Sequence, residues 1–296
     1  MKQPLKNLLP IAAILLSSHA FAGELPAVVP VGNPGNISDV SGYGAVAYEY
    51  KIGKFEVTWG EYCEFLSAVA KSDTHSLYDD RMDGEYGGIS RSGGDGSFTY
   101  SVKDGWAKRP VGYITVQSAA RFANWLSNGK GSADTENGSY KISGDQVTVP
   151  NHAALAAGKD VKWVIASENE WYKAAYYDAK KGSGGYWSYP AKSDDAPDAS
   201  INSGGSSEAG SHKNAVTAYG TFDQGGNNWE FNDTQSGEKW GLRGGSWYQN
   251  DNPGYMQSGT RYDDFCGKWP HYGFRIVALG GAAAAPAPAA KAPAKK

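Results

Sequence analysis

Three segments of the chain place apolar residues at helical spacing behind a capping residue. The first begins after Thr58, which forms a Thr-x-x-Glu capping box with Glu61. The apolar positions that follow are Tyr62, Phe65, Leu66 and Val69, which share one face of a helix. We therefore predict a helix that starts at residue 59 and packs its aromatic face into a core.

The other two predicted helices have the same organisation. Thr115 caps a run whose apolar face is Val116, Ala119, Ala120, Ala123 and Leu126, and Asn128-Gly129 supplies a stop signal. Ser167 and Glu170 form a second capping box, which precedes Trp171, Ala174 and Ala175. Most aromatic residues in these segments are expected to be core residues.

Between the helices the pattern is that of short strands and long loops. Residues 48–57 alternate in the manner of a strand, and residues 241–248 and 273–277 are predicted as further short strands. Residues 73–105 and 178–215 are rich in Gly, Ser and Asp and have no apolar period. Long excursions of this kind are often functional. The pattern predicts one α+β domain.

The two ends of the chain differ from this pattern. Residues 1–22 have a basic start, an apolar run and a small-x-small site, which is typical of a secretory signal. Residues 280–296 contain only Ala, Pro, Gly and Lys, and are predicted to be a disordered tail. We divide the chain into this signal, a lead-in over 23–47, a domain over 48–279 and the tail. The mature protein is expected to be secreted or periplasmic.

Charge and composition exclude two classes of function. Without the signal and the tail, 23 Lys and Arg face 31 Asp and Glu, a net charge of −8, and basic runs are absent from the sequence. This argues against nucleic-acid binding, which needs clustered cations. No later apolar run has the roughly 20 residues of a membrane span. The 39 Gly, 10 Trp and 19 Tyr instead favour irregular loops that are anchored by large side chains.

Only two cysteines are present, Cys63 and Cys266. In an oxidising compartment they could form one disulfide. They could equally be two buried free thiols, because a free cysteine behaves as a small apolar residue. The sequence leaves both alternatives open.

One segment has the donors of a calcium site. Asp223, Gly226, Asn228 and Glu230 lie within a Gly- and Asn-rich stretch, and positions 226, 228 and 230 point the same way in an extended chain. Carboxylate and carbonyl oxygens suit a hard cation such as Ca²⁺. Spacing alone also allows a solvated turn.

Six blocks of sequence, in order, resemble the formylglycine-generating enzyme or sulfatase-modifying factor family. They are KIGKFEVTWGEYCEFL (51–66), RPVGYITVQSAARFANWLS (109–127), ASENEWYKAAYY (166–177), AYGTFDQGGNNWEFND (218–233), LRGGSW (242–247) and HYGFRIV (271–277). The resemblance runs from about residue 48 to residue 277. It implies a C-type-lectin-like α+β fold that is poor in regular structure.

The resemblance also implies roles for particular residues. Calcium is expected at the segment already described, with Asp223 and Glu230 as side-chain ligands and Gly226 and Asn228 as carbonyl donors. A substrate cleft is expected around Trp229, Ser246, Gln249, Arg261 and His271.

The sequence departs from the oxidase members of this family at their copper site. Those members hold Cu(I) between two cysteines, which suit a soft metal. The matching positions here are Gln249 and Gly254, and neither Cys63 nor Cys266 lies in the motif. We therefore expect no copper.

Two functions remain as hypotheses. The first is an exported, calcium-stabilised, non-oxidase binding or structural module, whose cleft would hold a peptide or protein ligand. The alternative is a formylglycine-generating oxidase that acts on the cysteine of a sulfatase. Because a fold does not determine a function, the missing thiols favour the first hypothesis.

Overall fold

The computed structural model describes residues 24–132, 134–182, 184–199, 201, 203–248 and 252–281. The predicted signal, most of the predicted tail and Gln249 therefore lie outside the described residues. Within these ranges, no helix combines the length and the apolar character that crossing a membrane requires.

All three predicted helices are present and start where the capping residues indicate. Thr58 and Ser167 each complete a capping box with the glutamate three residues on, and Thr115 accepts from the Ser118 N–H. The α2 helix ends before Asn128, and Gly129 follows with a φ of 84°. The helices are α1 (Trp59–Val69), α2 (Val116–Ser127), α3 (His152–Ala156) and α4 (Glu168–Tyr176), with 3₁₀ turns η1 (Asp80–Asp83) and η2 (Pro253–Met256).

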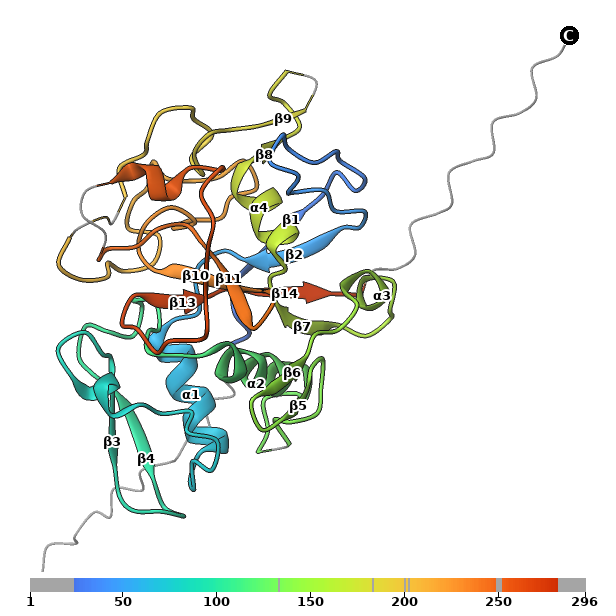
Figure 1. Ribbon diagram of the computed structural model, residues 1–296. Coiled ribbons are helices and arrows are strands. Elements are labelled where there is room, and N and C mark those ends of the chain that lie inside the picture. Colours follow the sequence, from blue (N-terminus) through green and yellow to red (C-terminus); the bar gives the residue numbers. More distant parts are fainter. Residues whose placement is uncertain are drawn as a thin grey trace, which may run out of the picture.

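Two four-stranded sheets form the centre of the molecule (Figure 1). The first has the order β1-β2-β14-β7 and comprises Val28–Val31, Tyr50–Gly53, Ile276–Leu279 and Lys162–Ile165. The second has the order β12-β11-β10-β13 and comprises Tyr262–Asp264, Lys239–Arg243, Trp229–Ser236 and Tyr272–Phe274. All pairings are antiparallel except that of β10 with β13.

Three two-stranded hairpins complete the regular structure. They are β3 (Ile89–Ser92) with β4 (Thr99–Val102), β5 (Lys141–Ser143) with β6 (Gln146–Thr148), and β8 (Tyr177–Asp178) with β9 (Gly185–Tyr186). The β3–β4 hairpin lies in the excursion over 73–105, so this segment is more ordered than its composition indicates.

The predicted strand over 273–277 is two strands. β13 belongs to the second sheet and β14 to the first, and Figure 1 shows them following each other through the middle of the molecule. The residue between them is Arg275, which is fully buried. Two further predicted strands are shorter than expected: 48–57 forms only β2, and of 241–248 only the first three residues lie in β11. Glycine at 244 and 245, with φ of 104° and 75°, ends that strand.

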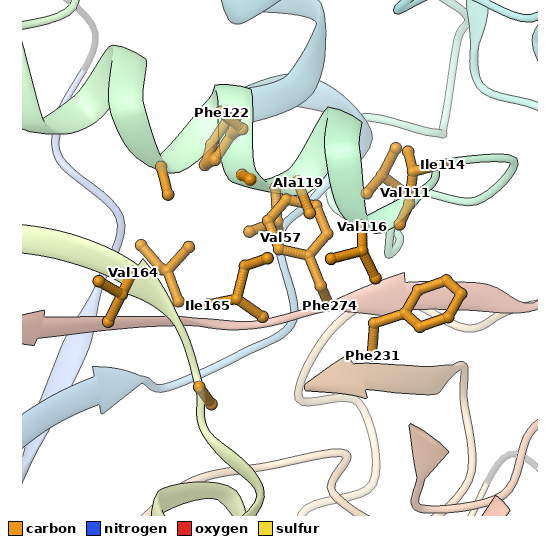
Figure 2. Close-up of a cluster of buried hydrophobic side chains, with 14 of the residues drawn as sticks. Val57, Val111, Ile114, Val116, Ala119, Phe122, Val164, Ile165, Phe231 and Phe274 are labelled. Carbon is orange, nitrogen blue, oxygen red and sulfur yellow. The ribbon is translucent and has the colours of Figure 1, made fainter. Parts of the chain in front are cut away.

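The core lies between α2 and the strands of both sheets (Figure 2). Phe122 contacts Phe65 of α1 and Phe274 of β13, with ring centroids 5.5 and 5.6 Å apart. Val164 and Ile165 of β7 and Phe231 of β10 are fully buried in the same cluster. Burial of such side chains contributes about 1.5–3 kcal/mol each.

Candidate functional site

The turn before β10 is built from residues that tolerate a left-handed backbone. Asp223, Gly226 and Asn227 have φ of 61°, 79° and 60°, and Asp, Gly and Asn are the residue types that adopt this conformation most readily. The Gly226 N–H donates to the Gly244 carbonyl at 2.9 Å. A Cβ at position 244 would lie 3.1 Å from the Gln224 carbonyl oxygen, so the turn and the Gly-Gly-Ser segment fit together only with glycine there.

Three carboxylates are buried behind this turn: Glu56, Asp223 and Glu230. Glu56 accepts from the Asn228 N–H at 3.0 Å and from the Asn227 amide at 2.9 Å. Burial, and after it the charges of Glu230 and Asp223, raises the pKa of Glu56 well above its usual value. Burial also raises the pKa of Asp223. Ionisation of all three carboxyl groups is therefore unfavourable unless a cation lies close to them.

Arg275 is the cation that contacts this cluster. Its Nε donates to Glu230 Oε2 at 2.6 Å, and its Nη2 donates to Glu230 Oε1. It also donates to the carbonyls of Gly53 and Phe222 at 2.9 and 3.0 Å. Trp171 Nε1 donates to Glu230 Oε2 at 2.7 Å. Both oxygens of the predicted calcium ligand Glu230 are thus hydrogen-bonded to protein groups.

Of the other predicted calcium ligands, Gly226, Asn228 and Asp223, some oxygens are free to bind a hard cation. Within the described chain, no hydrogen bond reaches the carbonyl oxygen of Gly226 or Asn228. Asp223 accepts from the Gly210 N–H at 2.6 Å through one of its oxygens. No three His, Cys, Asp or Glu side chains of the described residues form a metal-binding group. A cation here would be bound by Asp223 and backbone carbonyls, and it would share Glu230 with Arg275 and Trp171. The calcium site stays a prediction.

The predicted cleft residues have different surroundings. Trp229 and Ser246 are buried, and the Trp229 ring lies against Tyr255 and Tyr262, with centroids 5.9 and 5.1 Å apart. Arg261 donates to Glu168 at 2.9 Å and to Asp263 at 3.1 Å, which indicates a structural role. Trp229 and His271 are joined by a hydrogen bond from the Trp229 N–H to the His271 carbonyl.

His271 lies at the centre of an aromatic group, which we name the His271 cluster: His271, Trp247, Tyr248 and Trp269. The imidazole stacks on Tyr248 with centroids 4.9 Å apart and an interplanar angle of 11°, and lies 6.1 and 6.3 Å from Trp247 and Trp269. Tyr248 and Trp269 are 61% and 50% exposed, whereas His271 is buried. Contiguous exposed apolar groups often mark interaction sites, so this cluster is a candidate for one.

The imidazole of His271 is a neutral ring, and this charge state suits ligand recognition. Burial lowers the pKa of His271 to about 4, so the imidazole is uncharged at neutral pH. Its Nδ1 is buried and has no hydrogen-bond partner in the described part of the chain. A buried polar atom without a partner costs about 1–3 kcal/mol, which a ligand group could recover.

The two cysteines do not form the disulfide that the sequence left open. Both are free: Cys63 is buried on α1, and Cys266 lies beyond β12. Burial raises the pKa of both thiols, that of Cys266 to about 12. Without a metal ion, both thiols are therefore protonated at neutral pH. Gly254 is in η2, and it has no side chain to offer.

Sequence reasoning missed Glu56, Tyr248 and Trp269. Glu56 is the acidic residue within the predicted strand segment KIGKFEV, and an acid at an otherwise apolar position is a signal for a buried polar role. Tyr248 ends the segment predicted as a strand over 241–248, and Trp269 lies outside every predicted element, so the sequence carried no signal for their exposure.

The family described as the sulfatase-modifying factor enzyme 1-like domain matches residues 44–279. The solved structure of Treponema denticola variable protein 1 is similar, with 19% identity and a TM-score of 0.52, over 84% of this chain and 94% of that chain. A second similar structure is that of CarF, with 18% identity and a TM-score of 0.52, over 86% and 98%. A search of curated proteins finds no match. At these identities the structures bear on the fold alone.

Proposed function

The chain belongs to the sulfatase-modifying factor enzyme 1-like family, and we propose that it acts there as an exported, non-oxidase binding module. The observation that carries this proposal is the absence of thiols at positions 249 and 254 from a sequence that keeps the family's other blocks. Soft thiolate or thioether ligands select Cu(I), and Gln249 and Gly254 offer neither.

The binding surface is the His271 cluster. It combines two exposed rings, a neutral imidazole and an unpartnered ring nitrogen. Such a surface suits a peptide that presents an aromatic or proline side chain, because rings add area at low entropic cost. The ligand is accordingly a peptide or a segment of a protein, with a sulfatase as one candidate.

Peptides selected from a random display library should bind the wild-type protein through this cluster. Replacing Tyr248 and Trp269 together with alanine should weaken binding by at least about tenfold, because hot-spot aromatics contribute about 2 kcal/mol or more. Phe265→Ala is the matched control, since Phe265 is also exposed and its ring packs beside Lys239. Equal binding by the double variant would place the ligand elsewhere.

The oxidase alternative is tested with the same preparation. The protein is incubated with Cu(I), O₂ and a Cys-x-Pro-x-Arg peptide, and mass spectrometry detects any aldehyde. We expect none. Aldehyde that disappears when Cys63 or Cys266 is mutated would instead establish oxidase activity.

Calcium is proposed as a structural ion at the turn over 223–230, where it would neutralise the buried carboxylates. The chelator EDTA should lower the melting temperature of the wild-type protein, because a ligand that binds the folded state stabilises it by mass action. Asp223→Asn should be less stable and insensitive to EDTA. Glu230 variants are unsuitable, because they also remove the partner of Arg275. An unchanged wild-type melting temperature would exclude a stabilising calcium ion.

A further inference from the structure

Arg109 differs from the other arginines in its electrostatic partners. The sequence contains seven arginines, and six of them lie within 4.0 Å of an Asp or Glu oxygen. Arg109 has no such carboxylate among the described residues. Partly buried guanidinium groups are normally paired, because an uncompensated charge is costly to desolvate.

The contacts of Arg109 leave its buried Nε donor unused. Its Nη1 donates to the Ser206 carbonyl at 2.7 Å, and the guanidinium lies 4.9 Å from the centroid of the Trp106 ring. Its Nε is buried and donates to no described residue. These contacts hold the group in place but do not neutralise it.

A second unused polar atom lies in the same region. Ser207 Oγ is buried without a hydrogen-bond partner in the described chain. The Ser207 N–H donates to Asn227 Oδ1 at 3.0 Å, which anchors this residue to the turn before β10. Ser207 is therefore a second residue of this region that has a fixed backbone and an unused hydroxyl donor.

Arg109, Ser206, Ser207 and His212 line a pocket of about 420 Å³, which we name the Arg109 pocket. Among the described residues, no Asp or Glu lines it. His212 lies 3.8 Å from Asp198, but that carboxylate is 87% exposed and weakly coupled through solvent. The pocket thus offers a guanidinium, an imidazole and a hydroxyl group without an internal counterion.

We propose that the Arg109 pocket binds a small oxyanion: a phosphate, sulfate or carboxylate group, free or attached to a larger molecule. A planar guanidinium is suited to the oxygens of such groups, and charge-assisted hydrogen bonds are about twice as strong as neutral ones. A water molecule could accept from one donor but would leave the charge of Arg109 uncompensated. This site does not depend on the binding role of the His271 cluster.

Titration calorimetry with sodium phosphate, sodium sulfate and sodium acetate, each at constant ionic strength against sodium chloride, tests the proposal. We expect saturable binding of at least one anion, and the preferred anion identifies the chemical source. Arg109→Gln should weaken binding about tenfold or more, and Ser207→Ala should weaken it by a smaller factor. Lys159→Gln, which removes an equal charge from an exposed site, should bind as the wild type does.

A spectroscopic readout separates this site from general anion effects. Because the guanidinium packs on Trp106, binding should change the tryptophan fluorescence of the wild type, and Trp106→Phe should lose that change. If Arg109→Gln does not fold, Ser207→Ala provides the test of the proposal. This variant should fold, because the Ser207 hydroxyl has no hydrogen-bond partner in the described chain to lose. The proposal is overturned if none of the three anions binds, or if Arg109→Gln or, in its place, Ser207→Ala binds as tightly as the wild type.

Discussion

Replacing His152 with alanine is expected to lower the free energy of unfolding by about 3–5 kcal/mol, because the change leaves two buried carboxylates without their cation. His152 Nδ1 lies 2.9 Å from Glu170 Oε2, and its Nε2 lies 2.9 Å from Asp233 Oδ2. Tyr140 and Tyr48 donate to the same carboxylates at 2.7 and 2.9 Å. This network joins α3, α4 and β10, three elements that are distant in sequence.

The pH dependence of stability reports the charge on His152. Burial alone would lower the pKa of His152, but Glu170 and Asp233 outweigh it and raise the pKa to about 11. The folded state therefore holds a proton that the unfolded state releases near pH 6.5. The stabilisation is complete below about pH 6.5 and is lost progressively as the pH rises to about 11.

Urea unfolding between pH 6 and 11 measures this effect. His152→Gln is the matched variant, because glutamine keeps hydrogen-bonding groups and removes the charge. We expect the wild type to lose more stability than His152→Gln as the pH rises. Parallel curves for the two proteins would show that His152 is uncharged in the folded state.

Replacing Arg275 with methionine is the second change for which we expect a large effect. Arg275 is fully buried and neutralises Glu230 next to Glu56 and Asp223. Methionine preserves much of the apolar stem but leaves Glu230 and two carbonyls without this donor. It also removes the positive charge that acts on Glu56 and Asp223. Breaking a buried pair in this way costs about 3–5 kcal/mol, and we expect a loss of this size in the free energy of unfolding.

A double-mutant cycle tests whether this cost arises from the pair. Glu230→Gln alone leaves Arg275 unpaired and should also destabilise the protein. The double variant Arg275→Met/Glu230→Gln should be more stable than the sum of the two changes predicts, because no unpaired charge remains at this pair. Additive effects in urea unfolding would mean that the ion pair contributes nothing beyond packing. Arg121→Met, which breaks the less buried pair with Glu136, is the control and should cost less.

The helices were predicted correctly because the sequence signals for their starts are local. A capping box at Thr58 or Ser167 satisfies the first N–H groups of its own helix, so residues three positions apart are sufficient to define the start. The strands were less accurate for the opposite reason. Residues 273–277 have the apolar character of one strand, but the division at Arg275 depends on which sheet each half joins.

The candidate site shows the same limit. The sequence pointed to Trp229 and Arg261 as cleft residues, but the structure buries the first beneath Tyr255 and Tyr262 and pairs the second with Glu168. The exposure of Tyr248 and Trp269 could not be predicted, because it depends on what the fold leaves uncovered.

The sequence by itself determined the family, the α+β class, the helix starts and the lack of a cysteine pair at positions 249 and 254, since each of these follows from residue identity and short spacing. Only the tertiary structure decided the partners of buried charge. His152, Glu56 and Arg109 look alike in sequence as isolated polar residues. In the structure, the first is held between two carboxylates and the second lies among like charges, whereas the third has no carboxylate partner among the described residues. Partners of this kind come from segments far apart along the chain, so their electrostatic balance exists only once the chain has folded.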